Sequence, residues 1–166
     1  PRMRFRPSLA LLSSSLAAVL LLGAPSPESV AESAKATAFF ERAFDEAVAR
    51  SPMMMTQLGM KRDYDRWDDF SEPKVAADLQ LVAGHLAELK ATIDFALLDE
   101  PTKVSYRMFE RAAEEAIEGW RWRHHNYPIN QMSGIHTTLP AFLISYHTVD
   151  NLADARAYVA RLRGMD

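Results

Sequence analysis

Apolar residues recur every three or four positions through most of this 166-residue chain, a pattern that predicts amphipathic helices. The first such stretch covers residues 34–50, where alanines and phenylalanines share one face. Ser51 and Pro52 then predict a new helix start, because Ser is a favourable N-cap and Pro suits the first helical position. This short helix, residues 53–58, is expected to end at Gly59, a natural left-handed C-cap.

A longer helix is predicted to follow a mixed-charge loop and to run from Ser71 to about Leu98. Its apolar stripe consists of Val75, Leu79, Val82, Leu86, Leu89, Ile93 and Leu97. Further helices are predicted over residues 102–125, 138–146 and 152–163, the last of them capped by Asn151. The chain has only six glycines and no Asn-Gly hairpin signal. These features predict an all-α fold of about five to six amphipathic helices.

The chain starts with the layout of a bacterial secretory signal peptide. Three arginines within the first six residues precede an apolar run at residues 9–22, and a Pro- and Ser-rich segment follows. The run is short for a bilayer span, which needs about 20 apolar residues, and an uncleaved membrane anchor is the alternative. Cleavage is expected after Ala31, with Ala24 as the other candidate. Residues 1–31 are therefore predicted to direct export, and the protein is expected to be periplasmic or secreted.

The remaining residues, 32–166, are predicted to form one helical domain with a mildly acidic balance. They carry 16 Lys and Arg against 21 Asp and Glu, a formal charge of −5. This charge argues against nucleic acid as a partner, because nucleic-acid-binding proteins present a basic face. It also leaves no basic stripe for anionic lipid, so no membrane partner is expected after signal cleavage. The chain has no cysteine, which removes disulfides, haem attachment and thiol chemistry.

The five histidines do not form a metal-binding motif. None is followed by a second His four residues later, and no Glu is followed by a His at the third position. His85 lies beside the apolar stripe and is expected to be packed or hydrogen-bonded, whereas His124 and His125 end a predicted helix. The sequence therefore predicts no catalytic residue and no metal ligand within this chain.

The segment at residues 126–136 is the candidate functional loop. Pro128 and Gly134 fix turns in it, and polar loops carried by a rigid scaffold are where binding residues concentrate. The candidate substrate-lining residues are Tyr127, Asn130, Gln131 and His136. The alternative is that these polar groups only satisfy the backbone of neighbouring helix ends.

Several short phrases follow one another in an order that resembles a known bacterial family. The phrases are Phe44-Asp45-Glu46, Ser51-Pro52, Thr56-Gln57-Leu58-Gly59, Tyr127-Pro128-Ile129-Asn130-Gln131, Gly134, Asp154-Ala155 and Tyr158-Val159-Ala160-Arg161-Leu162. Their order and spacing resemble the N-terminal part of the proteins grouped as domain of unknown function 885. The resemblance covers most of the chain after the predicted signal.

This resemblance implies a helical, gluzincin-type zinc metallopeptidase-like protein of several hundred residues. In such proteins a His-Glu-x-x-His helix and a downstream Glu hold zinc, and the Glu within the motif activates the bound water. The present chain lacks this motif, so zinc is implied only for a longer parent, of which the chain is expected to be the N-terminal portion. Its expected partners are then the remainder of its own chain and a peptide substrate. The alternative is a self-sufficient exported helical module that binds a partner without catalysis, which leaves open whether the protein is an enzyme.

Overall fold

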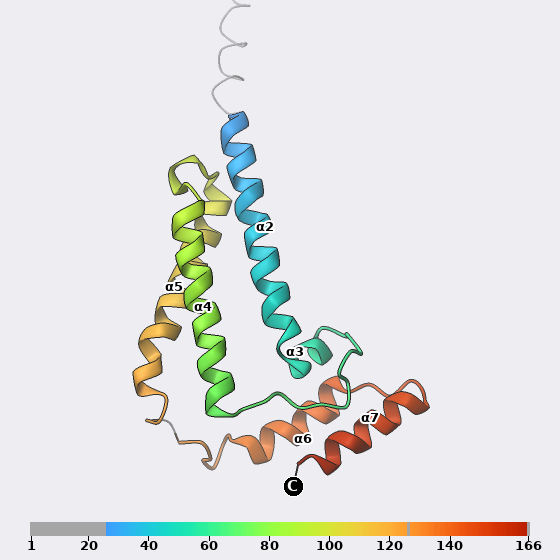
Figure 1. Ribbon diagram of the computed structural model, residues 1–166. Helices are drawn as coiled ribbons and strands as arrows, with labels where there is room; N and C mark the ends of the chain where they lie inside the picture. The colour runs from blue at the N-terminus through green and yellow to red at the C-terminus, as the bar shows by residue number, and fades with distance from the viewer. Residues whose placement is uncertain (1–25, 126, 166) are drawn as a thin grey trace, which may run out of the picture.

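The computed structural model describes residues 26–125 and 127–165, and these form six α-helices and two short 3₁₀ turns (Figure 1). The helices are α2 (Pro27–Ala49), α3 (Pro52–Gln57), α4 (Glu72–Thr92), α5 (Glu100–Gly119), α6 (Ile135–Tyr146) and α7 (Leu152–Arg163). The 3₁₀ turns are η1 (Phe95–Leu97) and η2 (Trp120–Trp122). No β-strand occurs in the described ranges, and the predicted all-α fold is confirmed.

The long helices α2, α4 and α5 lie alongside one another, and α6 and α7 lie near α3 at one end of this bundle (Figure 1). The core of the bundle consists of Ala36, Phe39, Leu89, Ile93, Leu98 and Tyr106. Phe39 meets Phe109 edge to face with 5.4 Å between ring centroids, an arrangement that adds to the energy of burial. In the predicted apolar stripe, Leu86 and Leu89 are buried but Val75 is exposed. The first turn of the stripe therefore does not face the core.

Capping side chains set most of the helix starts. α2, α3, α5 and α7 each begin at a residue whose side chain accepts a hydrogen bond from the backbone N–H three positions later. These caps are Ser26, Ser51, Asp99 and Asn151, with distances of 2.8–3.1 Å. A proline also occupies the first or second position of α2, α3, α4 and α5. The predicted restart at Ser51 and the cap at Asn151 are confirmed.

Two helices end earlier than the prediction. α4 ends at Thr92 rather than near Leu98, because the Asp94 side chain accepts a hydrogen bond from the Ala96 N–H (3.0 Å) and starts η1. Short acidic side chains compete in this way with helical backbone bonds. α5 ends at Gly119 and is followed by η2, although the apolar periodicity predicted one continuous helix. Glycine is a poor helix former, which favours a boundary at that position.

Two other helices begin earlier than predicted. α2 starts at Pro27 because Ser26 caps it. α6 starts at Ile135, where the Gly134 carbonyl oxygen accepts the N–H groups three and four residues later at 3.1 and 3.0 Å. His136 therefore lies in the first turn of α6 and not in the loop to which the sequence assigned it.

The predicted signal peptide lies mostly outside the described residues. Residues 1–25, which include the arginines, the apolar run and Ala24, are not described. The cleavage position expected after Ala31 lies within the first two turns of α2. Among the described residues, no helix has both the length and the apolar character needed to cross a bilayer.

Candidate functional site

The loop before α6 is closed by its own polar side chain. The Asn130 side-chain oxygen accepts hydrogen bonds from the backbone N–H groups of Met132 and Ser133, both at 2.8 Å. The Asn130 amide nitrogen donates to the Ser133 hydroxyl at 3.0 Å, and the Asn130 backbone N–H donates to the Ser133 carbonyl at 2.9 Å. This is the way in which Asn stabilises a turn, by bonding to the backbone just after it. The carboxamide of Asn130 is therefore occupied within the loop.

Gly134 completes the turn. Its φ of 153° lies in the region that favours glycine, and a Cβ there would lie 2.8 Å from His136 Nδ1 and 3.1 Å from the Ile129 Cα. Gly134 also forms an isolated antiparallel bridge with Ile129. The turn and the start of α6 thus form one unit.

Many apolar side chains of this region are exposed, although Phe142 and Leu143 on α6 are buried. Tyr127 and Met132 are 86% and 84% exposed, and Ile144 on α6 is 81% exposed. Residues 127–149 contain no Asp, Glu, Lys or Arg. Depletion of charge together with exposed aromatic, Met and Ile side chains is typical of the centre of a binding interface. We call the exposed side chains of residues 127–149 the neutral surface.

The four candidate substrate-lining residues all lie at the surface. Tyr127, Gln131 and His136 are exposed, and no hydrogen bond of their side chains occurs among the described residues. Asn130 is exposed as well, but its side chain holds the turn. Their role in contacting a substrate stays a prediction. Of the four, Gln131 and His136 have side-chain amide or ring nitrogen groups available for such a contact.

A second polar cluster, which sequence reasoning missed, surrounds a fully buried arginine on α7. Arg161 has no exposed surface. Its Nε donates to the Arg66 carbonyl at 2.9 Å, and its Nη2 donates to the Thr56 hydroxyl at 2.8 Å. Its Nη1 lies 3.1 Å from His147 Nδ1. The guanidinium therefore joins α7 to α3, to the loop before α4 and to His147, the residue that follows α6.

Aromatic rings complete the surroundings of this guanidinium. Tyr64, Trp67 and Phe142 have ring centroids 5.1–5.4 Å from its central carbon, within the range of cation–π attraction. Among the described residues, no carboxylate lies within ion-pair distance of Arg161. Burial lowers the pKa of Arg161, and the charges of Tyr64 and nearby aspartates oppose this effect. Carbonyl oxygens and rings thus take the place of a counter-ion.

The hydrogen bonds of His147 define its tautomer. Arginine can only donate, so His147 Nδ1 accepts from Arg161 and carries no proton. Nε2 then carries the proton and donates to the Asp154 carbonyl at 3.2 Å, while the ring stacks on Tyr64 with 4.0 Å between centroids. Burial lowers the pKa of His147; the Asp154 hydrogen bond opposes this, and the charges of Arg161 and Lys61 reinforce it.

The free energy of unfolding is expected to fall as the pH drops from about 6.5, the ordinary value for histidine. In the unfolded chain His147 takes up a proton near that pH, whereas the pKa in the folded chain is lower. The unfolded state therefore binds more protons in this window, and acid favours it. The contribution of neutral His147 is complete above about pH 6.5 and is lost as the pH falls toward the folded-state pKa. Urea unfolding across this window measures the effect.

Two variants separate His147 from the other histidines. His147→Gln should flatten the pH dependence, because glutamine does not titrate. His125→Gln removes an exposed histidine that has no carboxylate within ion-pair distance among the described residues, and it should leave the slope of the parent. A slope in His147→Gln equal to that of the parent would contradict the assignment.

The remaining histidines are dispersed. His85 is buried as expected, and its Nε2 lies 2.9 Å from a Glu46 carboxylate oxygen. His124 lies 3.5 Å from Glu72. Within the described ranges, no three His, Asp or Glu side chains come together around one point. The donor groups present therefore do not fit the zinc that the family resemblance implies, and no catalytic step is assigned to that metal here.

The fold and the site define the class: an all-helical protein with an uncharged, apolar loop surface beside its last two helices. The family model described as "Bacterial protein of unknown function (DUF885)" matches residues 52–166, from α3 through α7. The chain belongs to this family, as its phrases suggested. Of those phrases, the one at residues 44–46 precedes the matched range and Ser51-Pro52 spans its start; the others lie within it. No match was found among curated proteins or among solved structures.

Proposed function

We propose that this chain is the helical portion of an exported, zinc metallopeptidase-like protein, in which it contacts the substrate and does not carry the metal. The observation that carries the proposal is the loop at residues 127–136. Its polar turn is closed internally, which leaves apolar side chains and two free polar groups directed outward. Membership of the DUF885 family and the resemblance of that family to helical metallopeptidases support the assignment.

The loop offers the chemistry that an extended peptide needs. The Gln131 amide supplies a donor and an acceptor for peptide backbone groups, and the exposed Tyr127 and Met132 supply contact for apolar side chains. A preformed turn reduces the entropy that binding must overcome. The preferred peptides are therefore uncharged and apolar.

Gln131→Ala is expected to weaken binding of a fluorescein-labelled, uncharged decapeptide of Ala, Leu, Phe and Gln by about fivefold. This is the loss that corresponds to one hydrogen bond of about 1 kcal/mol. The melting temperature should not change, because the Gln131 side chain has no intramolecular partner among the described residues. Asn130→Ala should weaken binding and lower the melting temperature, because its carboxamide holds the turn. Fluorescence anisotropy and thermal melts measure the two effects.

Val104→Ser serves as the control, because Val104 is an exposed apolar residue of α5 outside the loop. It should leave peptide affinity unchanged. If Gln131→Ala and Tyr127→Ser both bind the peptide as tightly as the parent, the loop does not contact substrate. If Asn130→Ala lowers only the melting temperature, the Asn130 carboxamide serves the fold alone.

A second candidate function is an exported helical module that binds another protein without catalysis. The neutral surface favours it, because it continues from the loop onto the outer face of α6, where Ile135, Ile144 and Tyr146 are exposed, while Phe142 and Leu143 on the inner face are buried. The two candidates predict different effects of Ile144→Ser, which changes α6 and not the loop. Peptide binding should be unaffected by this change, whereas docking of a protein on the whole neutral surface should weaken.

A further inference from the structure

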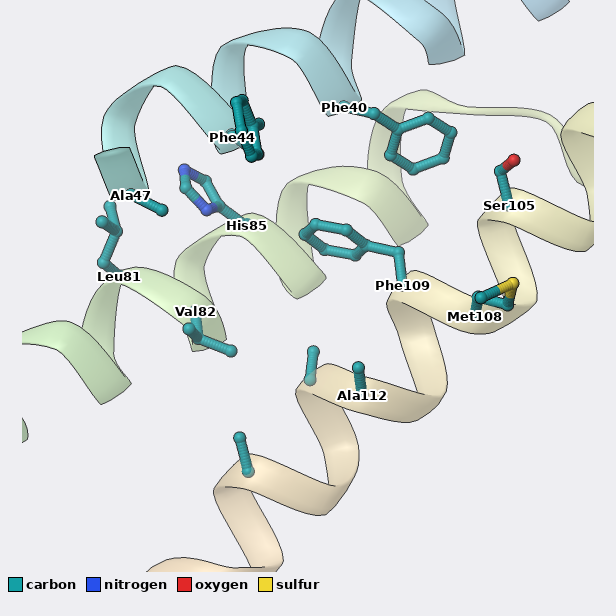
Figure 2. Close-up of a pocket in the computed structure, with 13 residues that line it drawn as sticks. Phe40, Phe44, Ala47, Leu81, Val82, His85, Ser105, Met108, Phe109 and Ala112 are labelled. Atoms are coloured by element: carbon teal, nitrogen blue, oxygen red, sulfur yellow. The ribbon is translucent and has the colours of Figure 1, made fainter. Parts of the chain in front are cut away.

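An apolar groove lies between α2, α4 and α5. It encloses about 620 Å³, and Figure 2 shows side chains from all three helices pointing into this space. Ala113 and His85 are buried at its base, whereas Phe44 and Met108 remain 47% and 67% exposed. Large apolar side chains that border a groove and stay exposed mark a binding site for another molecule.

The walls of the groove carry small residues at helical spacing. α2 contributes Ala43 and Ala47, and α5 contributes Ala112 and Ala116. Residues four positions apart form the ridges that pack in helix pairs, and helix axes approach within 8–10 Å according to the side chains at the contact. The groove thus runs along two helices and has walls shallow enough to admit the apolar face of a third.

His85 gives the groove a polar group without an intramolecular partner. Its side chain is only 10% exposed, and Nε2 donates to the Glu46 carboxylate at 2.9 Å. In the neutral ring Nδ1 then carries a lone pair, and it has no hydrogen-bond partner among the described residues. Among those residues, every fully buried side-chain nitrogen or oxygen has a hydrogen-bond partner. Because Nδ1 has none, it is not fully buried, and the space it faces is the groove that His85 lines. An occupant with a hydroxyl or N–H donor among its apolar groups satisfies it.

The charge around the groove selects among apolar occupants. Most carboxylates of α2, α4 and α5 are ion-paired, but Glu41 and Asp45 on α2, which directly follow the groove residues Phe40 and Phe44, have no ion-pair partner among the described residues. Positive charge beside the apolar face of an occupant would complement these helices, and negative charge would be repelled. A fatty acid, with its carboxylate, fits this environment poorly. A helix with lysine or arginine beside its apolar face fits it well.

We propose that the groove binds a basic amphipathic α-helix of another polypeptide. The apolar face of that helix enters between α2 and α5, one of its hydroxyl or N–H groups donates to His85, and its basic flank faces Glu41 and Asp45 of α2. This is helix-in-groove recognition. The groove is separate from the loop at residues 127–136, so the proposal stands whether or not the protein acts on peptides.

Binding of designed peptides to the full chain tests the proposal. The probe is a fluorescein-labelled 18-residue helix of Leu, Ala and Lys, with Leu and one Ser on one face; a second peptide has Glu in place of Lys. The Lys peptide should bind, and the Glu peptide should bind at least about tenfold more weakly. Ala112→Phe fills the groove and should weaken binding of the Lys peptide by at least about tenfold. Ala87→Phe, at an exposed alanine of α4 outside the groove, should change it less than about twofold.

Met108→Ser is the second variant, because Met108 is largely exposed and its loss leaves the fold intact. It should weaken binding of the Lys peptide by about threefold. Equal affinity of Ala112→Phe and Met108→Ser with the parent would overturn the groove as the site. Equal affinity for the two peptides would overturn the selection for basic helices. If the chain self-associates and Ala112→Phe abolishes this, the groove binds a second copy of the chain, and the proposal of a foreign partner is overturned. The second copy would offer α7, which exposes Leu152 and Val159 beside arginines.

Discussion

Replacing Arg161 with methionine should lower the free energy of unfolding by about 3–5 kcal/mol. Methionine fills much of the space but donates no hydrogen bond. The Thr56 hydroxyl, the Arg66 carbonyl and His147 Nδ1 would each lose their donor in a buried site. An unpaired buried polar group costs about 1–3 kcal/mol, and local rearrangement recovers part of the total. Urea unfolding followed by circular dichroism measures the loss.

Arg163→Met is the matched control, because Arg163 is an exposed arginine of the same helix. Its effect should stay within about 0.5 kcal/mol. Arg161→Lys keeps the positive charge but replaces the planar donor fork with one ammonium group, so its stability should fall between the two. A parent-like stability of Arg161→Met would mean that apolar packing replaces the cluster without loss, and the central role assigned to Arg161 would be wrong.

The order and type of the helices were predictable because each rests on local signals. Apolar periodicity marks the buried faces, and Ser51 and Asn151 act as caps through side chains that reach only three residues ahead. The boundaries that failed depend on competing local bonds of similar strength. Asp94 is an example: the sequence pattern places it within the predicted helix. Its side chain instead accepts a hydrogen bond from the backbone N–H of Ala96, and the helix ends there.

The Arg161 cluster was not predictable because its partners come from distant parts of the chain. An arginine on an amphipathic helix is expected to face solvent, and nothing in the sequence of α7 separates Arg161 from Arg156 or Arg163. The difference arises when α3 and the residue that follows α6 converge on one side of α7. The sequence phrase that contains Arg161 is one of those that carry the family resemblance. That Arg161 is buried, however, can be seen only in the folded structure.

The candidate loop was located correctly as an irregular segment, yet its exposed chemistry differs from the expectation. Sequence reasoning emphasised its polar side chains as substrate contacts. In the structure, the carboxamide of Asn130 is hydrogen-bonded within the turn, and the exposed apolar side chains are Tyr127, Met132 and neighbouring isoleucines. Polar residues in a tight turn satisfy backbone groups first, because each unpaired group is costly. Apolar contact is therefore the main property that the loop offers to a partner.

Leu89→Asp should abolish most of the folded population at room temperature. Leu89 is fully buried in the core of the bundle, and an unpaired buried carboxylate together with the lost apolar contact costs about 4 kcal/mol or more. Domains of this size are typically stable by only about 5–15 kcal/mol, so this loss is a large share of the total. Val75→Asp, at the exposed start of the same predicted stripe, should lower stability by less than about 1 kcal/mol. Urea unfolding of both variants measures the difference. Equal losses in the free energy of unfolding would mean that the stripe is buried along its whole length, and that α4 packs differently from the arrangement in Figure 1.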